Sequence, residues 1–119
     1  MTVTTETTAV VRRYIEVWNE RDAARRAAAM EAALTEDSVY SDPDYEGLEG
    51  HAALSEAIDR AQERFGDLRF ELGEVLGAHH GHVLFTWRLG APGAEPAATG
   101  YDAAEIAADG RLRRVVGFF

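Results

Sequence analysis

The C-terminal stretch GYDAAEIAADGRLRRVVGFF (Gly100–Phe119) predicts a β-hairpin. Its centre, Asp109-Gly110, is a strong turn signal, because the favoured two-residue hairpin turns need residues that tolerate a positive φ. The runs on either side, Ala97–Ala107 and Leu112–Phe119, are expected to form the two strands.

Two further strands are predicted upstream of this hairpin. They cover Leu68–Leu76 and His82–Leu89, and Gly81 near the turn lets them pair. The segment Gly90–Pro96 is rich in glycine and proline and is expected to form a flexible turn before the last two strands. The second half of the chain is therefore expected to be a β-meander.

The first half of the chain carries helical patterns. From about Thr8, apolar residues recur at helical spacing, and this first helix is expected to end near Asn19–Arg21. Asp22 can cap a second helix, which covers Ala23–Leu34 and consists almost entirely of good helix formers.

A short strand and a third helix complete the pattern. Ser38–Asp42 is interpreted as a strand that Pro43 stops, and Asp44–Gly50 as a loop. The apolar spacing over Leu54–Phe65 marks the third helix. The order α-α-β-α-β-β-β-β favours one α+β domain over residues 1–119, with one curved sheet wrapped around the helices.

The composition excludes several kinds of chemistry. The chain has 119 residues, no cysteine, and 12 basic residues that are all arginines. Without lysine there is no Schiff base and no P-loop lysine, and without cysteine there is no thiol nucleophile, disulfide or thiolate zinc site. Carboxylates, tyrosine and arginine remain for any catalysis.

The charge balance limits the partners. The chain carries 21 Asp and Glu residues and a net charge of -9, which argues against nucleic acid as a partner. No apolar run approaches the roughly 18 residues that a membrane span needs, and the first residues lack the pattern of a signal peptide. We therefore expect a cytoplasmic protein.

Asp102 is the most unusual of the acidic residues. The period of two along its strand places it on the more apolar face, next to Gly100 and Ala104. A carboxyl there either keeps its proton because it is desolvated, with room for a ligand beside it, or pairs with an arginine such as Arg88 or Arg114. The sequence leaves both readings open.

Three other features are candidates for function. Asp42 ends a strand just before a proline. There it is either an exposed functional carboxylate or a residue that initiates a turn. Tyr14 places a polar hydroxyl in the middle of an apolar helical row, which is also compatible with a core tyrosine. The histidines His79, His80 and His82 suggest a metal site, but adjacent strand residues point to opposite faces, so a solvated turn is the preferred interpretation.

Three segments together resemble the nuclear transport factor 2-like superfamily of cone-shaped α+β barrels, and within it the SnoaL-like branch. They are AVVRRYIEVWNERD (9–22), SVYSDPDYEGLEGHAAL (38–54) and GYDAAEIAADGRLRRVVGFF (100–119). The resemblance implies helices packed in a strongly curved, mostly antiparallel sheet. It also implies a homodimer, because curved sheets of this fold often pair through one exposed face.

Within the superfamily, the ketosteroid isomerases place a tyrosine on the first helix, a base Asp in an Asp-Pro motif and a second Asp on a late strand. Tyr14, Asp42 and Asp102 match those positions here. The resemblance implies that Asp42 shuttles a proton, while Tyr14 and a protonated Asp102 donate hydrogen bonds to an enolate oxygen. The implied activity is cofactor-free isomerisation of a small apolar ketone, steroid-like or polyketide-like.

Two alternatives accompany this expectation. The SnoaL-like polyketide cyclases use a strand Asp similar in place to Asp102, together with a histidine on the preceding strand, where this chain has Trp87 and Arg88. The other alternative is a non-catalytic module for ligand binding or dimerisation. In each ligand-binding case, the pocket is expected to be lined by aromatic residues: Trp18, Tyr40, Phe65, Trp87 and Phe118.

Overall fold

The computed structural model describes residues 3–119, and this part of the chain forms three helices and six strands. Their bounds are α1 Thr5–Asn19, α2 Ala23–Ala33, β1 Leu34–Asp42, β2 Tyr45–Glu49, α3 Gly50–Phe65, β3 Arg69–His79, β4 His82–Gly90, β5 Ala98–Ile106 and β6 Leu112–Phe118.

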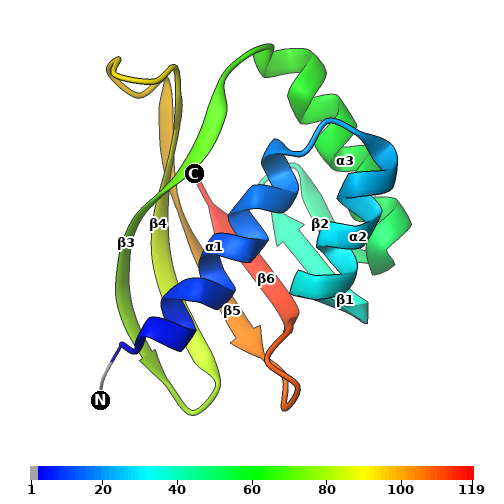
Figure 1. The fold of residues 1–119 in the computed structure, drawn as a ribbon, viewed down its shortest axis with the longest axis vertical. Coiled ribbons are helices and arrows are strands. Elements are labelled where there is room, and N and C mark those ends of the chain that lie inside the picture. Colours follow the sequence, from blue (N-terminus) through cyan, green and yellow to red (C-terminus); the bar gives the residue numbers. More distant parts are fainter. Residues whose placement is uncertain (1–2) are drawn as a thin grey trace.

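The strands form one mixed sheet in the order β2-β1-β6-β5-β4-β3. All neighbouring strands are antiparallel except β1 and β6, which are parallel. The sheet curls without closing, α1 crosses its concave side, α2 packs beside α1, and α3 packs against β1 and β2 (Figure 1). The expected α+β class and the curved, mostly antiparallel sheet are confirmed.

Two of the helices, α1 and α2, begin where the sequence supplies a side-chain cap. The Thr4 side chain accepts a hydrogen bond from the backbone N–H of Thr7 at 3.0 Å, and the Asp22 carboxylate accepts one from Arg25 at 2.9 Å. One face of α1 then enters the core with buried side chains: Val10, Val11, Tyr14, Ile15 and Val17. No helix within residues 3–119 is long and apolar enough to cross a membrane.

A buried arginine ties the helices together. Arg26 of α2 is 2% exposed, and its guanidinium donates to the backbone oxygen of Glu20 at 2.9 Å and to the Asp59 carboxylate of α3 at 2.7 Å. It also donates to the side chains of Ser55 and Gln62. Every side of the buried charge thus has an acceptor, as a desolvated guanidinium requires.

The segment expected to be a loop after Asp42 contains an additional strand, β2. The Asp42 carboxylate accepts the backbone N–H groups of Asp44 and Tyr45 at 2.8 and 3.1 Å, which turns the chain back sharply. The returning segment then pairs antiparallel with β1, so that Tyr40 lies opposite Leu48. The sequence of β2 has no alternating pattern that would predict a strand. The strand is stabilised by its pairing with the edge of β1.

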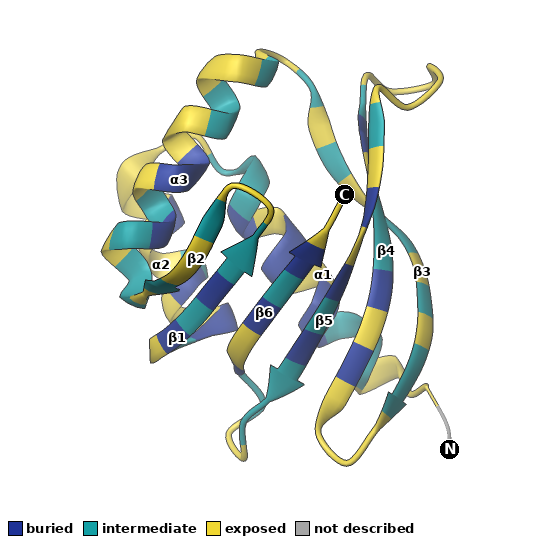
Figure 2. Cartoon of the chain, turned by 180° about the vertical axis from the view of Figure 1, so that it is seen from behind, coloured by how far each residue is buried: buried dark blue, intermediate teal, exposed yellow. Residues whose placement is uncertain are grey.

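The C-terminal hairpin forms as predicted. Gly110 in its turn has a φ of 87°, a conformation that a residue without a Cβ adopts freely. On β5 the buried residues are Gly100, Asp102 and Ala104, while Tyr101 is exposed. Figure 2 shows the outer face of the sheet with this alternation of buried and less buried positions. Asp102 therefore points to the concave side, as the period of two predicted.

Candidate active site

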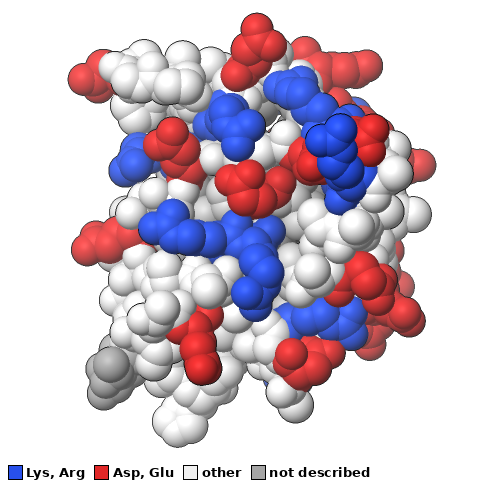
Figure 3. Space-filling model, in the orientation of Figure 1, with Lys and Arg blue, Asp and Glu red and all other residues white. Residues whose placement is uncertain are grey.

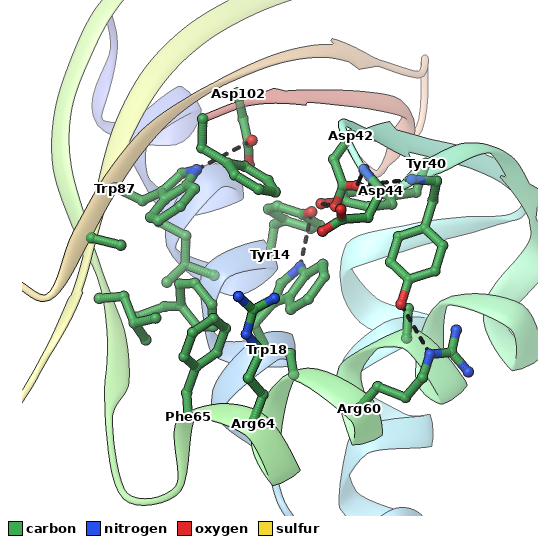
Figure 4. Close-up of a pocket in the computed structure, with 18 residues that line it drawn as sticks. Tyr14, Trp18, Tyr40, Asp42, Asp44, Arg60, Arg64, Phe65, Trp87 and Asp102 are labelled. Carbon is green, nitrogen blue, oxygen red and sulfur yellow. Dashed lines mark hydrogen bonds between the residues drawn. The ribbon is translucent and has the colours of Figure 1, made fainter.

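A cavity of about 200 Å³ lies between the concave face of the sheet, α1 and α3. In Figure 4, Asp42 and Asp102 extend from the sheet, Tyr14 and Trp18 from α1, and Arg60 and Arg64 from α3. The residues that line it are Tyr14, Ile15, Trp18, Tyr40, Asp42, Asp44, Tyr45, Ala57, Arg60, Ala61, Arg64, Phe65, Phe70, Trp87, Leu89, Ala98, Asp102 and Phe119. The fold thus brings the three candidate acid–base residues to one apolar cavity.

Tyr14 presents its hydroxyl to the cavity. The side chain is 1% exposed, and its hydroxyl oxygen accepts a hydrogen bond from Trp18 Nε1 at 2.9 Å. Burial, followed by the nearby charge of Asp102, raises the pKa of Tyr14 well above its usual value. Because the indole N–H can only donate, the tyrosine proton is left over for a ligand.

Asp102 is a buried carboxyl that keeps its proton up to near-neutral pH. It is 6% exposed, and Trp87 Nε1 donates a hydrogen bond to its Oδ1 at 3.3 Å. Burial raises the pKa of Asp102 from 3.8 to about 7; the Trp87 hydrogen bond lowers this pKa and the charge of Asp42 raises it. At neutral pH the carboxyl can therefore act as a hydrogen-bond donor or exchange a proton.

No ion pair to Asp102 exists in the described part of the chain, so the reading in which an arginine neutralises it does not hold. Arg88 follows the inward-pointing Trp87 on β4, and its guanidinium lies 3.5 Å from the Glu71 carboxylate instead. Arg114 precedes the buried Val115 on β6 and is exposed. The alternation of strand residues carries both guanidinium groups away from the cavity.

Asp42 lies at the end of β1 and accepts three hydrogen bonds. Its Oδ1 accepts the two backbone N–H groups of the turn, and its Oδ2 accepts the Tyr40 hydroxyl at 2.6 Å. Burial, and then the neighbouring Tyr14, raises the pKa of Tyr40 above its ordinary value. A carboxylate has about four lone-pair sites, so one remains available to a ligand.

Gly117 makes the close approach of these groups possible. It lies opposite Asp102 in the β5–β6 pairing. A Cβ at this position would lie 2.9 Å from Asp102 Oδ1, 3.4 Å from the Asp42 Cβ and 3.5 Å from the Tyr40 hydroxyl. A glycine here therefore leaves the space in which the two carboxyl groups and the hydroxyl converge.

Four of the five expected aromatic residues line the cavity: Trp18, Tyr40, Phe65 and Trp87. The prediction for Phe118 is wrong. It is 56% exposed, because the inward positions of β6 are Val115 and Gly117, so residue 118 points to the outer face. Phe119, one residue further, lines the cavity instead and packs against Trp87 with ring centroids 5.9 Å apart.

The residues of α3 that line the cavity were mostly not predicted from the sequence. Ala57, Arg60, Ala61 and Arg64 line the cavity together with the expected Phe65. Their spacing of three or four residues places them on one side of a helix, and this was the signal that could have revealed them. Asp44 and Tyr45, which also line the cavity, follow from the turn that starts β2.

The histidine cluster lies away from the cavity, in the turn between β3 and β4. His79 Nδ1 and His80 Nδ1 are 3.0 Å apart. No group of three or more histidine, aspartate or glutamate residues within residues 3–119 is arranged to hold a metal ion.

The comparisons with known proteins agree with this fold. The family model described as the SnoaL-like domain matches residues 11–115. This chain belongs to the SnoaL-like family. A candidate isomerase of the same family from Agrobacterium tumefaciens has a solved structure that is 31% identical, with a TM-score of 0.86 and 97% of each chain covered.

Two more distant structures resemble this SnoaL-like domain in fold. A SnoaL-like protein of unknown function from Burkholderia thailandensis is 18% identical, with a TM-score of 0.73 over 98% of this chain and 97% of its own. A candidate polyketide cyclase from Xanthomonas campestris is 20% identical, with a TM-score of 0.66 over 96% and 90% of the two chains. No functionally curated protein matches the sequence.

Proposed function

We propose that this SnoaL-like domain is a cofactor-free isomerase that moves a double bond into conjugation with a ketone. The observation that carries the proposal is the buried Asp102 carboxyl, protonated near neutral pH, beside the free hydroxyl proton of Tyr14 in an apolar cavity. Two such donors stabilise negative charge that develops on a ketone oxygen.

The reaction begins at a carbon next to the ketone. Asp42 takes the proton from that carbon, the C–H electron pair forms the enolate double bond, and the ketone oxygen gains the negative charge. Tyr14 and neutral Asp102 donate hydrogen bonds to that oxygen. Asp42 then returns the same proton to the far carbon of the original double bond, which gives the conjugated enone without net gain or loss of atoms.

A β,γ-unsaturated ketone tests this proposal, because the conjugated product absorbs in the ultraviolet. Both a ketosteroid and a one-ring cyclohexenone should be assayed. Asp42→Asn keeps a carbonyl oxygen for the turn but cannot accept the proton, so the rate is expected to fall roughly 100- to 10,000-fold.

Asp44→Asn is the matched control. Asp44 is an exposed carboxylate that lines the same cavity two residues away, and its variant is expected to keep most of the activity. Equal rates for the wild type and Asp42→Asn would remove Asp42 as the base. Ligand binding without turnover would favour the non-catalytic binding module.

The cyclase reaction is the second candidate, and the pKa of Asp102 supports it. A carboxyl with a pKa of about 7 is matched to general acid–base catalysis at neutral pH. The Asp102→Asn variant separates the two reactions. An asparagine still donates a hydrogen bond and retains part of the isomerase activity, whereas a reaction that needs Asp102 to exchange a proton is abolished.

A further inference from the structure

Two arginines occupy the wall of the cavity opposite the carboxyl groups. Arg60 and Arg64 are four residues apart on α3, so they lie on the same side of the helix. Figure 4 shows the guanidinium of Arg64 directed toward Trp18, and that of Arg60 joined by a dashed hydrogen bond to a tyrosine hydroxyl. Asp42 and Asp102 approach from the sheet, so the cavity has an acidic side and a basic side.

Neither guanidinium has a carboxylate within ion-pair distance among residues 3–119. Arg60 Nε donates to the Tyr45 hydroxyl at 2.9 Å, and its guanidinium lies 5.3 Å from the centre of the Tyr45 ring. The guanidinium of Arg64 lies 5.3 Å from the centre of the Phe65 ring. These aromatic partners position the two cations without neutralising them.

The two arginines belong to a protein whose surface carries both kinds of charge. The protein has an excess of acidic residues, with a net charge of -9. On the face shown in Figure 3, acidic and basic side chains lie close together. Among residues 3–119, some other arginines pair with carboxylates, as Arg69 does with Glu16 at 3.3 Å, and others, such as Arg12, do not. Arg60 and Arg64 are distinguished by lining one cavity, and two such cations without a carboxylate partner there point to an anion supplied by the ligand.

The volume of the cavity limits the size of this ligand. An apolar cavity of roughly 150 Å³ accepts benzene. A space of about 200 Å³ accordingly takes one ring or two small ones. The walls beside this space are aromatic, with Phe70 and Trp87 in edge-to-face contact at 5.5 Å. Tyr14 and Asp102 line the same cavity as the two arginines, so one ligand in this space can contact both groups.

We propose that the cavity binds a small ring ketone that carries a carboxylate at the end remote from the ketone, and that Arg60 and Arg64 bind this carboxylate. The placement of the ketone at Tyr14 and Asp102 rests on the proposed function. The anion site rests on the two arginines alone. Asp42 repels an anion on the sheet side, which favours the orientation with the carboxylate at the arginines.

Isothermal titration with a matched pair of compounds tests the anion site. The probes are 4-acetylbenzoate, which has a ketone and a carboxylate on opposite sides of one ring, and 4-acetylbenzamide, its neutral analogue. The wild type is expected to bind the benzoate about tenfold more tightly than the amide at low salt. This preference should shrink as the salt concentration rises.

The double variant Arg60→Gln/Arg64→Gln is expected to bind the two probes equally, while its affinity for the amide stays unchanged. Both side chains are exposed, so the fold should survive, and a thermal melt verifies this. Arg12→Gln is the matched control, because it removes one exposed arginine of α1 that does not line the cavity. It should keep the preference for the benzoate.

Equal affinity of the wild type for both probes, binding of neither, or a preference that persists in the double variant would each overturn the anion site. The isomerisation assay tests the proposed function independently of the titration that tests the anion site. A carboxylate preference in a protein that converts no enone would refute the proposed function and leave the anion site standing.

Discussion

Among the individual residues, Asp102 is a carboxyl whose ionisation destabilises the native state. A carboxyl that is 6% exposed and has only one side-chain hydrogen bond, from Trp87, is poorly solvated when it ionises. The unfolded chain ionises near pH 3.8, whereas the folded protein holds the proton to about pH 7. The native state therefore loses stability over this interval, because the unfolded state releases the proton first.

The Asp102→Asn variant should reveal this cost. Well below pH 3.8 the carboxyl is protonated in both states and contributes no pH dependence. As the pH rises from 3.8 to about 7, the wild type should lose on the order of 4 kcal/mol of unfolding free energy relative to the variant, and above pH 7 the difference should level off.

Urea unfolding of both proteins between pH 4 and pH 9 measures the difference. The variant corrects for the other titrating groups, which the two proteins share. Parallel stability curves over the whole range would mean that Asp102 is solvated in the native state.

At the level of secondary-structure elements, Arg26 connects α2, α3 and the end of α1. Its side chain is buried and fully hydrogen-bonded, whereas the Asp59 carboxylate that it contacts is 65% exposed. The two ends of this ion pair therefore contribute unequally. Most of the stabilisation should come from the buried donors of Arg26 and from the packing of its aliphatic part.

Arg26→Ala is expected to lower the unfolding free energy by roughly 2–4 kcal/mol, because it leaves the Gln62 side-chain oxygen without its donor, removes one of the two donors to the Glu20 backbone oxygen and deletes the buried aliphatic part of the side chain. Asp59→Asn should cost less than about 1 kcal/mol, since its carboxylate is largely solvated. Chemical denaturation measures both. An equal loss in the two variants would place the stabilisation in the charge pair itself.

For the whole molecule, the outer face of the sheet is the surface that we propose as a homodimer interface. Apolar side chains lie in neighbouring cross-strand rows there: Leu84 is paired with Ala103 and Val116 follows, while Tyr101 is paired with Phe118. Leu84, Tyr101 and Phe118 are 41%, 52% and 56% exposed. An apolar surface of this kind, continuous over several strands, is characteristic of protein interfaces.

Leu84→Arg should convert the proposed dimer to a monomer, because it places a charge within this apolar surface. Sedimentation velocity over a range of protein concentrations measures the change. Val3→Arg is the control, since Val3 is also exposed, at 38%, but lies outside the sheet. A wild type that sediments as a monomer at all concentrations would contradict the proposed dimer.

The sequence by itself determined the helices, the C-terminal hairpin and the inward direction of Asp102. These features depend on local rules: the apolar spacing of the helices, the cap Asp22, the positive φ of Gly110, and the alternation of strand residues. The start of α1 at Thr5, three residues before the expected Thr8, was not predicted. The resemblance to a known family also gave the correct family and led to Tyr14 and Asp42. The same alternation, applied to β6, would have excluded Phe118 from the cavity.

Only the tertiary structure decided what surrounds these groups. The pairing of β2 with β1 has no local signal in the sequence. The hydrogen bond from Trp87 to Asp102, and the space beside Gly117 that Asp102 and Asp42 share, involve residues that are distant in the sequence. The position of the α3 arginines at the cavity was also decided by the tertiary structure. A helix pattern predicts their spacing but not the element that they face. The pKa of Asp102 depends on this packing, since desolvation is a property of the assembled cavity and not of the residue alone.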